Sequence, residues 1–189
     1  MEPAKTDQEL VALVLKNRDE YRVLVERYEV PLRRYVGRLG ADDELAKDIL
    51  QESFIKAYLN LNDYDTALSF SAWMYRIAHN EAMSQFRKAR VRPSPLKREE
   101  DLMLFEMIPD PLDIVMEADA AMDRGVLRDA IAGLESRYRD ILVLRFFEEK
   151  SYNEISDILR MPEGTVATHI NRAKQKLREL MKGRAEPRE

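Results

Sequence analysis

The stretch SYNEISDILRMPEGTVATHI, residues 151–170, decides the fold of the C-terminal half. Ser151 and the Glu three residues later have the spacing of a capping box, which predicts that a short helix begins there and ends near Leu159. After a turn, Pro162 suits the first position of a longer helix that reaches about Met181. A short helix, a tight turn and a long helix are typical of a helix-turn-helix, whose second helix enters the major groove of DNA.

The predicted second helix has the chemistry of a DNA-binding helix. Its first turns hold side chains that would face the bases, Thr165, Thr168 and His169. Further along it carries basic side chains that could neutralise phosphates, namely Arg172, Lys174, Lys176, Arg178 and Lys182. The alternative is a plain helical hairpin with a solvated basic face. Because the turn, the caps and the charge agree, we favour DNA binding.

The N-terminal half has the periodicity of a helical bundle. Apolar residues recur at helical spacing within 21–39, where they mark two helices that Pro31 separates or kinks. Further helices are predicted over 42–61 and 70–89. The polar segment 62–69 interrupts the pattern between them.

Residues 93–120 divide the chain into two domains. They hold four prolines and many acidic residues without clear periodicity, which predicts a flexible linker. A helical domain is therefore expected over 1–92, a helix-turn-helix domain over 121–183 and a disordered tail over 184–189. The fold class is predicted to be all-α.

Composition restricts the function classes. There is no Cys and there are only two His, so disulfides, thiolate metal sites and Cys nucleophiles are excluded, and we expect neither a metal nor a cofactor. No apolar run of 18 residues exists and the N-terminus lacks the layout of a signal peptide, so a cytoplasmic protein without membrane insertion is expected. The net charge is −4, but basic and acidic residues are segregated along the chain. Residues 82–98 include six basic residues and no acid, whereas residues 101–123 include seven acids and no base.

Two helical faces are candidates for function. On the helix over 70–89, one arc holds an aromatic ring, polar groups and guanidinium groups, the combination that single-stranded DNA requires: Trp73, Arg76, Asn80, Ser84 and Arg87. The alternative is that Trp73 belongs to the core. On the helix over 42–61, charged and polar residues flank Phe54, and they indicate either a protein-binding face or a solvated surface: Asp48, Gln51, Glu52 and Lys56. No nucleophile, metal set or phosphate loop accompanies these carboxylates, so an enzyme with a small-molecule substrate is not predicted.

Two parts of the chain resemble one known family. The run DDELAKDILQESFIKAY, residues 42–58, followed by FSAWMYRIAHN, residues 70–80, resembles the polymerase-binding and promoter-melting domain of extracytoplasmic-function sigma factors. Residues 134–145 and the helix-turn-helix stretch resemble the C-terminal domain of the same family. The two motifs in this order are much more specific than either alone.

The resemblance implies a role for each candidate residue. In this family the helix with Asp48, Gln51, Glu52 and Phe54 docks on a coiled coil of the largest subunit of core RNA polymerase. The residues implied to hold the melting minus-ten element are Asn62, Asp63, Ser69, Trp73, Arg76, Asn80, Arg87 and Lys88. The C-terminal domain would touch the polymerase flap and read the minus-thirty-five element through Thr165, Thr168, His169, Arg172 and Lys174. Family members are usually restrained by an anti-sigma factor, which is a further expected partner.

Some residues depart from the family pattern. Ala167 and His169 stand where the family commonly has Lys or Arg, so this recognition helix has two fewer potential cations. Glu135 stands where the family usually has Pro. Two other readings remain: a sigma-like mimic that sequesters an anti-sigma factor without binding DNA, and a helix-turn-helix repressor that binds duplex DNA without polymerase.

Overall fold

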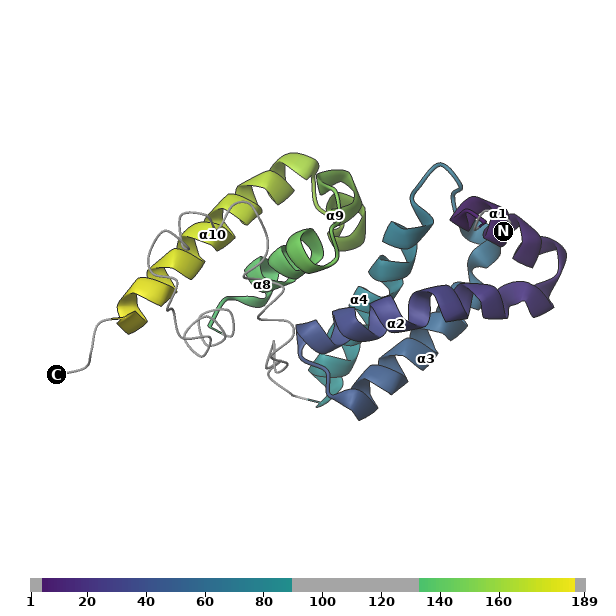
Figure 1. Ribbon diagram of the computed structural model, residues 1–189, viewed down its shortest axis with the longest axis horizontal. Coiled ribbons are helices and arrows are strands. Elements are labelled where there is room, and N and C mark those ends of the chain that lie inside the picture. Colours follow the sequence, from purple (N-terminus) through teal and green to yellow (C-terminus); the bar gives the residue numbers. More distant parts are fainter. Residues whose placement is uncertain (1–4, 90–132, 186–189) are drawn as a thin grey trace.

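The computed structural model describes residues 5–89 and 133–185, with side chains over 5–88 and 133–180. Within these ranges the regular structure is helical and there is no strand, as the sequence predicts (Figure 1). The principal helices are α1 (Asp7–Lys16), α2 (Tyr21–Leu39), α3 (Asp43–Leu59), α4 (Phe70–Ala89), α8 (Ser136–Leu142), α9 (Tyr152–Leu159) and α10 (Glu163–Ala185). The predicted linker over 93–120 lies outside the described residues, as do residues 121–132 of the predicted C-terminal domain. Helix α10 continues to Ala185, two residues into the predicted tail.

Helix α2 is a single helix that runs through Pro31, so of the two predicted alternatives, separation or a kink, separation was wrong. A proline inside a helix removes one backbone hydrogen bond. The apolar side chains before and after it nevertheless form one stripe, and Leu24, Tyr28, Leu32 and Tyr35 are all buried. Burial of this continuous stripe outweighs the loss of one hydrogen bond.

Helix α1 was not predicted, although the sequence contains its signal. Thr6 and Glu9 form a capping box, in which the Thr6 hydroxyl accepts from the Glu9 backbone N–H. Arg27 of α2 binds Asp7 at the start of α1 with an Nη1–Oδ1 distance of 2.8 Å. The buried face of α1 contributes Leu10, Val11 and Val14 to the core.

The helix-turn-helix is formed as the sequence predicts. Ser151 and Glu154 make the expected capping box at the start of α9. Arg160 ends α9 in the left-handed region with φ 52°, and the Ser156 hydroxyl donates to the Met161 carbonyl at 2.6 Å across the turn. Pro162 comes directly before α10, one position earlier than predicted.

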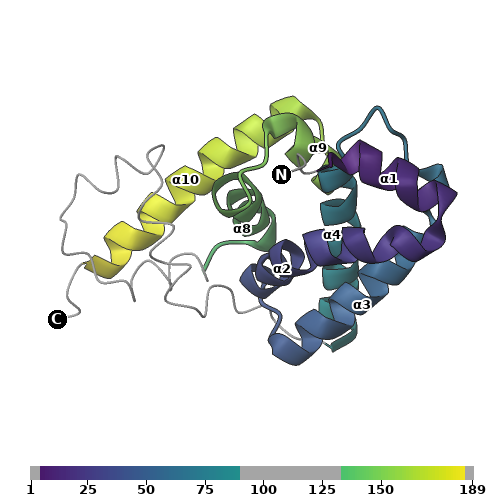
Figure 2. The ribbon, with the colours of Figure 1, turned by 45° about the vertical axis from the view of Figure 1, so that its right-hand side comes forward.

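The N-terminal and C-terminal domains share one apolar core. Helix α9 packs against α4, and the π-helical turn η3 (Val143–Phe147) packs against α2 (Figures 1 and 2). Close to this junction the Tyr35 hydroxyl lies 2.9 Å from His79 Nδ1. Burial, and then the Arg139 guanidinium of α8, lower the pKa of His79 to about 4. The imidazole is therefore uncharged at neutral pH, and its Nδ1 can accept the Tyr35 hydrogen bond.

Candidate nucleic-acid interface

An open pocket of about 700 Å³ lies along α4, beside the C-terminal end of α3 and the η2 turn (Leu61–Asp63). Its lining residues come from both halves of the chain: Lys56, Asn60, Asp63, Trp73, Arg76, Ile77, Asn80, Glu81, Ser84, Arg87 and Arg160. Five of the residues predicted for the minus-ten element are thus brought together, namely Asp63, Trp73, Arg76, Asn80 and Arg87. Helix α4 supplies most of them because they share one of its faces.

The pocket is rich in cations. Lys56, Arg76, Arg87 and Arg160 line it, against the carboxylates of Asp63 and Glu81. Such an excess of positive charge favours an anionic ligand.

The Glu81 carboxylate at the pocket wall is buried and ionised. Burial alone would raise its pKa, but hydrogen bonds from Lys56 and Gln85 outweigh this and hold the pKa of Glu81 below its ordinary value. Lys56, whose side chain is about half exposed, is thus paired with a carboxylate of α4, whereas Arg76 and Arg87 make no ion pair within the described residues. The Lys56 charge is offset by Glu81, which leaves the two arginines as the cations of α4 that can meet an anion.

Trp73 belongs to the core and also lines the pocket. Its side chain is only 8% exposed, and its ring lies 5.3 Å from the Tyr64 centroid and 5.5 Å from the Phe70 centroid. Trp73 is therefore mainly a core residue, and only a small part of its surface is exposed. Beside it, neither Arg76 nor Asn80 makes a hydrogen bond or ion pair with any residue that the structure describes. Both polar groups are available to a ligand.

Three other residues predicted for the minus-ten element lie outside the pocket lining. Asn62 is bound by Arg18, with a distance of 2.9 Å from Nη2 to Oδ1. Ser69 caps α4 by accepting from the Ala72 N–H, and its hydroxyl donates to Glu154 of α9. Lys88 is exposed near the end of α4.

Several pocket residues were missed. Lys56 and Glu81 are 25 positions apart, and Arg160 comes from the other domain, so no local spacing indicates that they meet. Helical spacing could have indicated the other two residues, because Ile77 lies one turn from Trp73 and Asn60 lies one turn from Lys56.

The exposed face of α3 is a second candidate surface. Asp48, Gln51 and Glu52 are exposed, as predicted for a docking face, whereas the Phe54 side chain is only partly exposed. Two apolar residues that were missed continue the same face: Ile55 is 44% exposed and Leu59 is 69% exposed. Acidic and apolar side chains at spacings of three and four form one stripe along the helix. Such a mixed stripe is typical of a protein-binding helix.

The predicted base-reading residues of α10 differ in exposure. Thr168 and Arg172 are exposed, while Thr165, His169 and Lys174 are partly buried. The His169 ring packs edge-to-face on Tyr138 with centroids 5.7 Å apart, and its buried Nδ1 has no hydrogen-bond partner within the described residues. Arg172 is therefore better placed than His169 to contact a phosphate.

The described residues contain no group of three His, Cys, Asp or Glu side chains that could hold a metal ion. None of the helices in the same ranges is both long and apolar enough to cross a bilayer.

Comparison with known proteins points to one family for both domains. Residues 24–92 match Sigma-70 region 2, and residues 124–177 match Sigma-70, region 4. The ECF RNA polymerase sigma factor SigW of Bacillus subtilis is 31% identical over 88% of this chain and 91% of its own. The RNA polymerase sigma-H factor of Pseudomonas aeruginosa is 32% identical over 89% of this chain and 90% of its own. The solved structure of CnrH in complex with the cytosolic domain of CnrY is similar in fold, with a TM-score of 0.68 and 22% identity over 94% of this chain and 97% of CnrH.

Proposed function

We propose, from the premise that this chain belongs to the extracytoplasmic-function group of the sigma-70 family, that it docks on core RNA polymerase through α3 and helps to melt promoters at the α4 pocket. Members of this family are transcription initiation factors that direct polymerase to promoters, not enzymes. The proposed site of action is the cytoplasm, where bacterial polymerase works.

The pocket on α4 carries the proposal for the minus-ten element. An unpaired strand needs cations for its phosphates and a stacking surface for its bases. The pocket joins the edge of Trp73 to Arg76 and Arg87, and Asn80 adds an amide that can hydrogen-bond to a base edge. This juxtaposition is the single observation on which the melting role depends.

The stripe on α3 supports docking on polymerase. Asp48 and Glu52 offer negative charge to a basic partner, and Ile55 and Leu59 offer apolar area that would be buried in a complex. The same surface would suit an anti-sigma factor, which we propose as a regulatory partner. The solved complex of CnrH with CnrY supports a bound partner for a protein of this fold.

Transcription by purified components tests the proposed function. Core polymerase alone and core polymerase with this protein are compared on fragmented genomic DNA, and the 5′ ends of the RNA are sequenced. We expect discrete start sites that need the protein. If the protein binds core polymerase but produces no new start sites, the promoter function is wrong, and the reading as a mimic that sequesters an anti-sigma factor is favoured.

Arg172→Ala tests the proposed contact of α10 with the minus-thirty-five element. Arg172 is exposed on α10, so its loss should weaken binding to all sequences and lower the log-log salt slope by about one. Fluorescence anisotropy of a labelled duplex at several salt concentrations measures both quantities.

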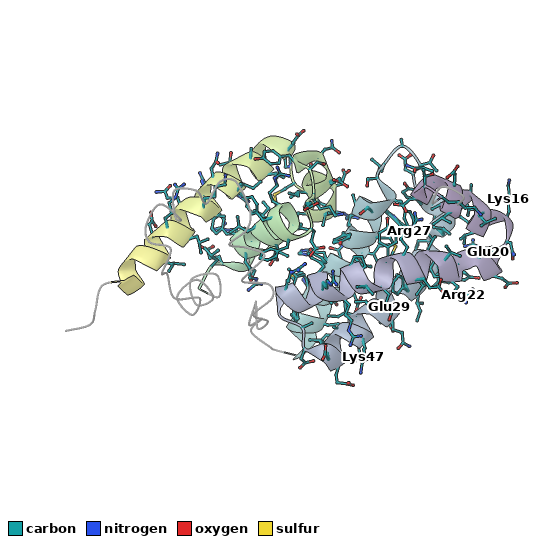
Figure 3. All side chains as sticks on the ribbon, in the orientation of Figure 1. Lys16, Glu20, Arg22, Arg27, Glu29 and Lys47 are labelled. Atoms are coloured by element: carbon teal, nitrogen blue, oxygen red, sulfur yellow. The ribbon has the colours of Figure 1, made fainter. Side chains whose placement is uncertain are left out.

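Two variants serve as controls for Arg172→Ala. Arg22→Ala removes an outward-pointing guanidinium from α2, where it pairs with Glu26 at 3.5 Å, and it should leave the slope unchanged (Figure 3). His169→Ala should also leave the slope unchanged, because His169 packs on Tyr138. An unchanged slope for Arg172→Ala would contradict the phosphate contact.

A further inference from the structure

Lys56 differs from the two arginines of the α4 pocket because its charge is already paired. Its ammonium group donates to Glu81 Oε2, whereas Arg76 and Arg87 make no ion pair within the described residues. The Lys56 side chain is 51% exposed and the Glu81 side chain is 3% exposed. The pair therefore joins a cation that solvent and ligands can reach to a carboxylate that is buried.

The surroundings of Glu81 keep it ionised. The Gln85 amide donates to Glu81 Oε1 at 2.8 Å, so each of the two carboxylate oxygens has a donor of its own. Burial raises the pKa of Glu81, but the hydrogen bonds from Lys56 and Gln85, and then the charges of Lys56 and Lys88, lower it by more. At neutral pH the carboxylate thus offers Lys56 the same kind of partner as the oxygen of a phosphate.

A phosphate that binds Lys56 has to compete with Glu81. If the ammonium group turns to a phosphate, the buried carboxylate keeps the amide of Gln85 but loses its counter-charge. A buried charge that has lost its partner costs free energy. Arg76 and Arg87 can meet a phosphate without breaking an ion pair of this kind. The Lys56–Glu81 pair therefore lowers the affinity of the pocket for an anionic strand.

We propose that Glu81 masks Lys56, because its carboxylate takes the place of a strand phosphate in the free protein and weakens the hold of the pocket on unpaired DNA. The choice of ligand rests on the proposed function, whereas the masking depends on the contacts of Glu81. Removal of the Glu81 charge would release Lys56 as a further cation beside Arg76 and Arg87. A purely structural role of the pair predicts the opposite, a loss of fold and of binding together.

Glu81→Gln tests the masking through a gain of affinity. Gln is close to Glu in size and its amide oxygen can still accept from Gln85, while the charge that holds Lys56 is removed. Because Lys56 is half exposed, it is not left as a buried charge, so the fold should persist. The probe is a fluorescein-labelled oligothymidylate of about 20 nucleotides, a length that exceeds the site of a typical single-strand-binding domain. Its anisotropy is measured with the full chain at several salt concentrations.

We expect Glu81→Gln to bind the oligothymidylate about fivefold more tightly than the unmodified protein. The log-log salt slope should become more negative by about 0.7, the change for one more phosphate of a single strand. Lys56→Ala combined with Glu81→Gln should lose both effects, because no ammonium group is left to release. Circular dichroism and thermal denaturation check that each variant is folded.

Glu26→Gln is the matched control. It makes the same change in net charge and also frees a cation, because Glu26 pairs with Arg22 at 3.5 Å on α2. Neither residue is part of the pocket lining, so affinity and salt slope should equal those of the unmodified protein. An equal gain in this variant would assign the effect to net charge and overturn the masking.

Arg76→Ala combined with Asn80→Ala separates the masking from the proposed function. If the pocket holds the strand, this variant binds the oligothymidylate more weakly than the unmodified protein. Unchanged binding would contradict the proposed melting surface, whereas a gain in Glu81→Gln that needs Lys56 would still support the masking. The absence of a gain in folded Glu81→Gln overturns the masking, whatever the double variant does. A gain that persists when Lys56 is replaced by Ala overturns it too, because the Glu81 charge then acts without Lys56.

Discussion

Reversal of Asp48 and Glu52 to Lys is expected to lower the affinity for core RNA polymerase on the order of a hundredfold or more. Both carboxylates are exposed on α3, beside Ile55 and Leu59. In the proposed complex they face a basic partner, so each new Lys would replace an attraction by a repulsion. Exposed charge changes usually alter the free energy of unfolding by less than about 0.5 kcal/mol, so the fold should survive. Binding is measured by fluorescence anisotropy with labelled protein, and unfolding is measured by thermal denaturation.

The matched control reverses two acids on another helix. Glu26 and Glu29 are exposed on α2 at a spacing of three, and Figure 3 shows Glu29 pointing away from the C-terminal domain. The variant with Lys at both positions changes the net charge by the same amount. If it loses as much affinity as the α3 variant, the loss comes from net charge and not from a docking face. Full affinity of the folded α3 variant would place the docking surface elsewhere.

Local signals in the sequence were sufficient for most of the helices. The capping box at Ser151 and the apolar periodicity of α3 and α4 depend on residues within a few positions of each other, and the structure has these elements close to the predicted bounds. Pro31 suggested a break in the helix because a proline removes a backbone hydrogen bond. Burial of an apolar stripe, which only the packed bundle provides, outweighs this local effect. Helix α1 was predictable from the spacing of Thr6 and Glu9.

The site was predictable only where it depends on one helix. Trp73, Arg76 and Asn80 share a face of α4, so helical spacing alone brings them to one side of the pocket. The partner of Glu81 is on another helix, and Arg160 reaches the pocket from the other domain. Contacts of this kind depend on how the elements pack, which sequence spacing does not contain. The same is true of Arg38 and Glu148, which form an ion pair although they are 110 positions apart.

Substitutions in the α4 pocket are expected to have a second large effect, on promoter opening. Extraction of a base from duplex DNA costs a few kcal/mol, which stacking and hydrogen bonds to the exposed base must offset. Arg76 and Asn80 offer free polar groups at the pocket, so Arg76→Ala combined with Asn80→Ala should leave polymerase binding intact and lower transcription from duplex promoter on the order of a hundredfold. Permanganate reactivity of promoter thymines measures the opening directly.

A template that is already unpaired across the minus-ten element separates opening from recruitment. It removes the extraction cost, so transcription by the double variant should largely return to the level of the unmodified protein. The matched control, Arg22→Ala with Gln8→Ala, removes one guanidinium and one amide from exposed positions on α2 and α1 and should transcribe normally from both templates. If the Arg76 and Asn80 variant opens duplex promoter normally, the α4 pocket is not the melting surface. If it binds polymerase but stays inactive on the unpaired template, these residues act after opening, because the cost that they were proposed to offset is then absent.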